Sequence, residues 1–193
     1  MSNDINNKID IPKIEEAVHQ ILVALGEDPE REGLRDTPRR VARMYSELLA
    51  GAQSDPTEHV QVFHEQYDEV VLLRNIPFYS ICEHHIMPFI GKAHIAYLPD
   101  GRVIGISKLA RILDSYARRL QVQERLTSQI ADFLMESLMP KGAAVVIEAS
   151  HSCTTIRGIK KAGSVMVTSA LRGLFKSDPR SRAEILSLIN ASS

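Results

Sequence analysis

Cysteine is scarce in this chain of 193 residues, where Cys82 and Cys153 are the only two and tryptophan is absent. Two cysteines are too few for the disulfide framework that stabilises many small secreted domains. In a reducing compartment, a cysteine close to histidines more often belongs to a metal or catalytic site. The surroundings of these two residues are therefore the first place to look for chemistry.

The chain also has almost no net charge and no long apolar run. The formal net charge is −1, a balance that gives no support for a general nucleic-acid or membrane-surface binder. No apolar run approaches the roughly 20 residues that span a bilayer. The polar segment 1–10 has no apolar centre of the kind found in signal peptides. These absences predict a cytoplasmic protein with neither a nucleic-acid nor a membrane partner.

Apolar spacing predicts five helices, over residues 12–25, 37–50, 107–120, 123–139 and 182–189. Thr37 and Ser107 are the expected N-caps of two of them. Apolar runs and alternation predict strands over residues 70–73, 76–81, 91–98, 103–106, 143–149 and 164–175. The strand at 103–106 is expected to return against 91–98, and the last two strands are expected to pair antiparallel.

Strands in hairpin-like pairs with helices between them predict an α+β protein, with an antiparallel sheet that carries helices on one face. The other face would be solvated or covered by another copy of the chain. Three segments are expected: a flexible N-terminus (1–11), an N-terminal helical segment (12–68) and a catalytic domain (69–193).

The stretch 82–85 places a thiol, a carboxyl and two imidazoles in consecutive positions, and Cys153 follows His151 by two residues. Cys82 and His85 are close enough in sequence to reach one ion across a turn, and zinc favours sulfur and nitrogen ligands. A structural zinc site uses four protein ligands, whereas Cys82, His85 and Cys153 supply three. Three ligands leave one coordination position open, as in catalytic sites, so we predict one catalytic Zn²⁺.

His84 and His151 would then be spare imidazoles beside the metal. If residues 149–153 are strand-like, His151 and Cys153 point to the same side. Histidine suits proton transfer because its pKa lies near the working pH. The alternative is that the cysteines are small buried hydrophobes and the histidines ordinary polar residues.

Basic side chains cluster at several places, and each cluster alone is typical of a solvated face. Ser107 and Lys108 lie at an expected strand-to-helix junction, which is a ready anion site, and Arg111 lies one turn further along. Arg157 follows Cys153, and Arg40 lies in the second helix. Around a metal pocket these cations indicate a polyphosphate substrate, although the chain has no Walker loop.

Glu124 lies at the start of the expected helix 123–139. A carboxylate there can simply favour the helix dipole. A buried carboxylate could also accept two hydrogen bonds from the N–H and NH₂ edge of guanine. The residue type alone leaves both interpretations open.

Taken together, these segments resemble the GTP cyclohydrolase I family. The matching segments follow the family's order, at residues 37–45 (TPRRVARMY), 82–85 (CEHH), 105–109 (GISKL), 118–127 (RRLQVQERLT), 151–153 (HSC), 157–158 (RG) and 173–175 (GLF). The run that ends in QERLT is the most specific, and the resemblance covers nearly everything from residue 12 onwards.

The resemblance implies a set of residue roles. Zinc would bind Cys82, His85 and Cys153, with His84 and His151 as acid–base groups. The substrate-binding residues would be Glu124 for guanine with Gln123 beside it, and Ser107, Lys108, Arg111, Arg157 and a neighbouring subunit's Arg40 for the triphosphate.

The resemblance also implies the tunnelling fold, with pentameric rings that pair into a homodecamer and active sites between subunits. The implied reaction converts GTP and water to 7,8-dihydroneopterin triphosphate and formate, the first step of pterin and tetrahydrofolate biosynthesis. A tunnelling-fold enzyme for another purine or pterin is one alternative, and the complete Cys/His/Cys set and the intact Gln123-Glu124 pair argue against it. A non-catalytic, zinc-stabilised nucleotide-binding oligomer is the other, and the spare histidines argue against it.

Overall fold

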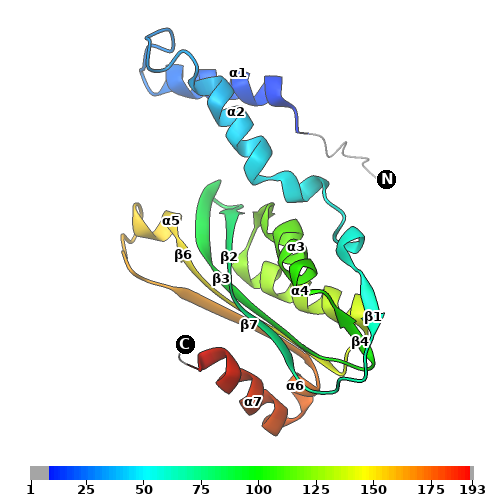
Figure 1. Cartoon of the computed structure of the whole chain (residues 1–193). Helices are drawn as coiled ribbons and strands as arrows, with labels where there is room; N and C mark the ends of the chain where they lie inside the picture. The colour runs from blue at the N-terminus through cyan, green and yellow to red at the C-terminus, as the bar shows by residue number, and fades with distance from the viewer. Residues whose placement is uncertain (1–8, 192–193) are drawn as a thin grey trace, which may run out of the picture.

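The computed structural model describes residues 9–191. They form a curled sheet flanked by helices, with a helical pair projecting from one end (Figure 1). The expected flexible segment 1–11 falls mostly outside the described residues, and a helix already begins at Ile11. The expected divisions after residues 11 and 68 stay predictions.

The projecting pair consists of α1 (Ile11–Ala24) and α2 (Thr37–Leu48), as the apolar spacing predicts. Asp10 caps α1 by accepting a hydrogen bond from the Lys13 amide. Thr37 is the first residue of α2 and not its N-cap, because Asp36 occupies that position. After α2, the 3₁₀ turns η1 (Ala50–Gln53) and η2 (Pro56–His59) lead into the sheet.

The main sheet has the strand order β5-β2-β3-β6-β7. Its members are β2 (Val71–Cys82), β3 (Met87–Leu98), β5 (Leu120–Gln121), β6 (Gly142–His151) and β7 (Met166–Gly173). All neighbouring pairs are antiparallel except β2 with the two-residue β5. The expected strands 70–73 and 76–81 are one strand, with a bulge between Leu73 and Ile76.

A second, two-stranded sheet joins β1 (Val62–His64) to β4 (Arg102–Ile104). The prediction that 103–106 returns against 91–98 is therefore wrong. The contact between Ile104 and β3 is made by a side chain: the Ile104 amide donates a hydrogen bond to the Tyr97 hydroxyl at 3.0 Å. The partner strand, β1, lies in the expected N-terminal helical segment, where no strand was predicted.

Helices cover both faces of the main sheet, so the expectation of helices on one face is wrong. The larger core joins one face to α3 (Ile106–Ala117) and α4 (Gln123–Leu138). The opposite face packs against α6 (Leu174–Ser177) and α7 (Pro179–Asn190). Figure 1 shows α7 across the sheet from α3 and α4. Because side chains alternate along a strand, Ala144 and Val146 supply apolar area to this second face.

Two helix starts bear on the site. Gly105 holds the N-cap position of α3, and Ser107 lies inside the first turn and caps nothing. α4 begins at Gln123, as predicted. Within residues 9–191, no helix combines the length and the apolar character that crossing a bilayer requires.

His94 is a buried polar residue on the α7 side of β3, and its side chain is 4% exposed. Neither ring nitrogen has a hydrogen-bond partner among the described residues, although Glu148 Oε1 lies 3.7 Å from Nε2. Burial lowers the pKa of His94, Lys92 and Arg74 lower it further, and Glu148 opposes them. The ring is therefore buried in its neutral form.

This burial predicts a pH-dependent stability. As the pH falls below about 6.5, His94 binds a proton in the unfolded chain before it does so in the folded chain, so the free energy of unfolding decreases. His94→Leu should flatten this loss, whereas His64→Leu, at an exposed position of β1, should not. Melting temperatures measured between pH 8 and pH 5.5 provide the check. Equal losses in all three proteins would contradict the prediction.

Candidate metal centre and active site

Cys82 is the last residue of β2 and is buried, and the chain then turns sharply before β3. The carbonyl oxygen of Cys82 accepts a hydrogen bond from the Ile86 amide at 2.9 Å. Ile86 has a φ of 53°, a conformation that is unfavourable for a β-branched residue. This tight turn places the side chains of His84 and His85 at the surface.

Cys153 reaches the same place from the end of β6, which is separated from β2 by β3. β6 ends at His151, and the single helical turn α5 (Ser152–Thr155) follows. The hydroxyls of Thr154 and Thr155 donate to the His151 carbonyl at 3.0 and 2.9 Å, which stabilises this change of direction. Residues 149–153 are therefore not one strand, and the expectation that His151 and Cys153 share a strand face is wrong.

Cys82, His85 and Cys153 nevertheless meet, and their donor atoms all lie within 4.8 Å of one another. This group could bind a metal ion. Burial and the neighbouring Cys82 thiol raise the pKa of Cys153, so the Cys153 thiol resists losing its proton without a nearby cation. A divalent cation would supply that charge, and two sulfurs with one imidazole nitrogen are ligands that zinc prefers.

His84 lies outside this three-donor group. Its Nδ1 is 4.0 Å from the Cys82 sulfur, and its ring stands at 86° to that of His85, with 6.3 Å between the ring centroids. One imidazole of the turn can thus bind a metal while the other stays free beside it.

His151 is held on two sides. Its ring stacks on Phe89 with 4.5 Å between centroids and an interplanar angle of 5°. Its Nε2 lies 2.8 Å from Gln123 Oε1. Burial lowers the pKa of His151, and the charge of Glu124 opposes this shift, so Glu124 is also near. A cavity of about 300 Å³ opens at His151, with Lys161 and Met166 among its lining residues.

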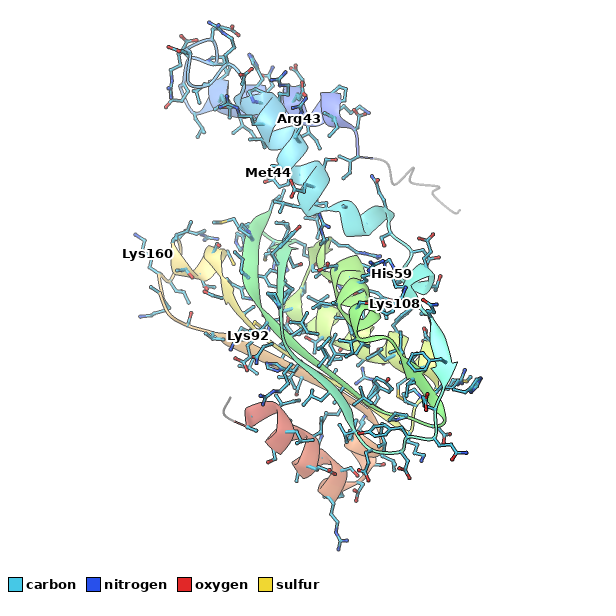
Figure 2. The ribbon with its side chains drawn as sticks, viewed as in Figure 1. Arg43, Met44, His59, Lys92, Lys108 and Lys160 are labelled. Carbon is cyan, nitrogen blue, oxygen red and sulfur yellow. The ribbon has the colours of Figure 1, made fainter. Side chains whose placement is uncertain are left out.

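The expected phosphate-binding residues do not all join this centre within one chain. The positive charge of Arg157 acts on the Cys153 thiol. By contrast, Arg111 lines a separate cavity of about 250 Å³ beside His59. Figure 2 shows Lys108 next to His59, on the opposite flank of the sheet from Lys160, a residue just beyond α5.

Ser107 shares the first turn of α3 with Lys108. Arg40 is exposed on α2 and lies 3.5 Å from Asp36. Gln123 was expected at the substrate, but its side chain is buried and bonded within the protein. A single chain therefore assembles the metal group, the histidines and Glu124, whereas Arg111 lines a different cavity.

A family model described as GTP cyclohydrolase I matches residues 14–190. The chain belongs to the GTP cyclohydrolase I family. Proteins named GTP cyclohydrolase 1 are 59% identical to it in Rhodopirellula baltica (189 residues, 97% of this chain and 82% of the relative) and in Thermoanaerobacter pseudethanolicus (185 residues, 95% and 98%).

A third family member, from Pelotomaculum thermopropionicum, is 60% identical over 179 residues, which cover 92% of this chain and 95% of the relative. Among solved structures, an archaeosine synthase QueF-Like in the apo form is 19% identical, with a TM-score of 0.45 over 54% of this chain and 93% of that one. That likeness is too low to add to the family assignment.

An ion pair that was not predicted from the sequence joins the turn at residues 82–86, called the metal turn below, to α4. Arg125 donates to both carboxylate oxygens of Glu83, at 2.6 and 2.9 Å. This hydrogen-bonded pairing lowers the pKa of Glu83. Both residues lie in segments that match the family, but no spacing rule connects positions 42 residues apart. The stacking of Phe89 on His151 has no sequence signal either.

We expect the pair to hold the metal turn in place. Arg125→Met should lower turnover by about tenfold, in line with the loss of other groups that orient metal ligands. Arg172 forms a comparable pair with Asp132, between β7 and α4, at 2.6 and 3.3 Å. Arg172→Met is therefore the matched control, and steady-state kinetics on both variants provide the check. Equal losses in the two variants would show that the Glu83 pair has no special role.

Proposed function

We propose that this protein converts GTP and water to 7,8-dihydroneopterin triphosphate and formate, with one Zn²⁺ per chain, in the cytoplasm. This reaction would begin pterin and tetrahydrofolate biosynthesis. The observation that carries the proposal is the convergence of Cys82, His85 and Cys153 beside His151 and Glu124, in a chain of this family. Its two cysteines are free thiols, as expected in a reducing compartment.

The proposed roles follow from the positions of the side chains. Zinc on the three donors would supply a Lewis acid and a water whose pKa falls towards about 7. His151 would protonate N7 of guanine as water adds at C8 and the imidazole ring opens. A second hydrolysis would release C8 as formate. His84 would assist ribose opening, after which the sugar rearranges to a ketone and the amine freed at the former N7 condenses with it, with loss of water.

Glu124 would accept hydrogen bonds from the N1–H and the 2-amino group of guanine. Glu124→Gln should lower kcat/KM for GTP by about 10- to 100-fold, because hydrogen bonds to a charged acceptor are worth about 1.5–3 kcal/mol. Inosine triphosphate lacks the 2-amino group, so the native protein should prefer GTP to it and the variant should prefer GTP less. An unchanged preference would remove Glu124 from guanine recognition.

We propose that the site is completed between subunits, in pentameric rings that pair into a decamer. Ser107, Lys108, Arg111 and Arg40 would then reach the triphosphate from neighbouring chains. Two features support assembly: the outer edge of β7 has no strand partner among residues 9–191, and Val165 and Val167 there are 56% and 61% exposed. Native mass spectrometry should find ten chains; a monomer that is fully active would contradict a shared site.

The function itself is tested with GTP labelled at C8. Zinc-loaded protein should release the label as formate, and ATP labelled at the same carbon should release none. A cyclohydrolase for another purine or pterin would leave GTP unchanged, and a nucleotide-binding oligomer would bind GTP without releasing label.

A further inference from the structure

Gln123 is a buried residue whose side-chain polar atoms all contact protein groups; it is 1% exposed. Its Nε2 lies 3.1 Å from the Ile147 carbonyl, 3.0 Å from the Met166 carbonyl and 3.1 Å from the Thr168 hydroxyl. Its Oε1 lies 2.8 Å from His151 Nε2. The amide thus bridges β6, β7 and the histidine at the end of β6.

These contacts determine which way the amide faces. A carbonyl oxygen only accepts hydrogen bonds, so the amide atom that faces Ile147 and Met166 must be the NH₂ group. The reversed amide would place Oε1 against two other oxygens. The two main-chain carbonyls therefore decide the orientation of the amide.

The threonines beside Gln123 agree with this orientation. The Thr127 hydroxyl donates to the main-chain carbonyl of Gln123 at 2.7 Å. Its oxygen is therefore free to accept from the Thr168 hydroxyl, also at 2.7 Å. Since Thr168 gives its proton to Thr127, its oxygen accepts from Gln123 Nε2. The hydroxyl hydrogens of Thr127 and Thr168 then each have one consistent position, and the two hydrogens of Gln123 Nε2 are shared among its three acceptors.

We propose that Gln123 is a positioning residue that fixes which ring nitrogen of His151 carries a hydrogen. Gln123 Oε1 can only accept, so His151 Nε2 must donate. In the neutral ring, Nδ1 then holds the lone pair, so Nδ1 is the atom that takes up a proton from solvent and delivers it to N7 of guanine. The stacked ring of Phe89 holds the imidazole in this orientation.

The inference rests on the proposed acid role of His151. It adds that Nδ1 is the atom that transfers the proton and that Gln123 determines this by its hydrogen bond to Nε2. It also separates Gln123 from substrate binding, since a side chain with 1% exposure has no free surface to offer a ligand. Removing the amide should therefore impair the chemical step far more than the binding of GTP.

Gln123→Met tests this separation, because methionine has a similar length and no hydrogen-bonding amide. Per zinc-loaded chain, kcat should fall about 10- to 100-fold while KM for GTP stays within about threefold. Gln121→Met is the matched control: Gln121 is 2% exposed and donates to the Tyr116 carbonyl and to Gln129. That variant should lose comparable thermal stability and keep its kcat within about threefold. A raised KM with unchanged kcat in Gln123→Met would overturn the proposal.

A second measurement does not depend on turnover. Solid-state NMR of zinc-loaded protein with ¹⁵N-labelled histidine at pH 8 should show His151 with its hydrogen on Nε2, with the signal assigned by its loss in His151→Asn. In Gln123→Met the signal should change to a mixture of tautomers. A hydrogen on Nδ1 in the native protein would overturn the inference. Absent GTP turnover with the expected tautomer would instead overturn the proposed function.

Discussion

Cys153→Ser should leave a folded chain that binds little zinc and turns over GTP at least about 10³-fold more slowly, because the activated water depends on the bound metal. The thiol is one of only three donors, all within 4.8 Å of one another, and no fourth histidine, cysteine or carboxylate in residues 9–191 belongs to that group. Serine is a poor zinc ligand in comparison with a thiolate. Elemental analysis of the purified variant and steady-state kinetics measure the two losses.

The two adjacent histidines make a sharp control for this prediction. His85→Ala should lose metal as Cys153→Ser does, whereas His84→Ala should keep one metal per chain and still lose activity. His84 lies outside the donor group, with its Nδ1 4.0 Å from the Cys82 sulfur. Retention of zinc by His85→Ala, with loss from His84→Ala, would show that the ligand assignment is wrong.

His151→Asn should lower kcat by about 10²-fold or more and leave the affinity for GTP nearly unchanged, as expected when a general acid is removed. The ring is stacked on Phe89 and bonded to Gln123, so it is pre-oriented before any substrate binds. Asparagine keeps a polar group near Gln123 but cannot transfer a proton. Single-turnover kinetics and equilibrium binding of GTP separate the two effects.

His64→Asn serves as the comparison, since His64 is exposed on β1 and does not belong to the metal-donor group. It should behave like the native protein in both measurements. If His151→Asn weakened GTP binding and left the chemical step intact, His151 would be a binding group and not the acid.

The metal group was predictable because chemistry restricts it: few residue types bind zinc, and only two cysteines were available. The start of α4 was also predictable, since helical apolar spacing and the polar Gln123 and Glu124 coincide there. The turn at Ser152 was not foreseen, because hydroxyl bonds from Thr154 and Thr155 to the main chain end β6 two residues before Cys153.

Long-range pairing limited the rest of the prediction. The second face of the sheet is lined by small residues such as Ala96 and Ala144, which in sequence look no different from those of the first face. The packing of α7 on the second face of the sheet could therefore be seen only in the structure. Gln123 shows the same limit at the site, because its burial depends on carbonyls of β6 and β7 that lie 24 and 43 residues away.

The most direct measurement is a zinc titration of metal-free protein in the presence of GTP, with formate and the pterin chromophore followed together. Both products should appear in equal amounts, and their rate should rise linearly until one zinc is bound per chain. Formate without the pterin would show that the ring opens but does not reclose, against the role given to His84. Full activity without zinc, or no product with zinc bound, would contradict the account.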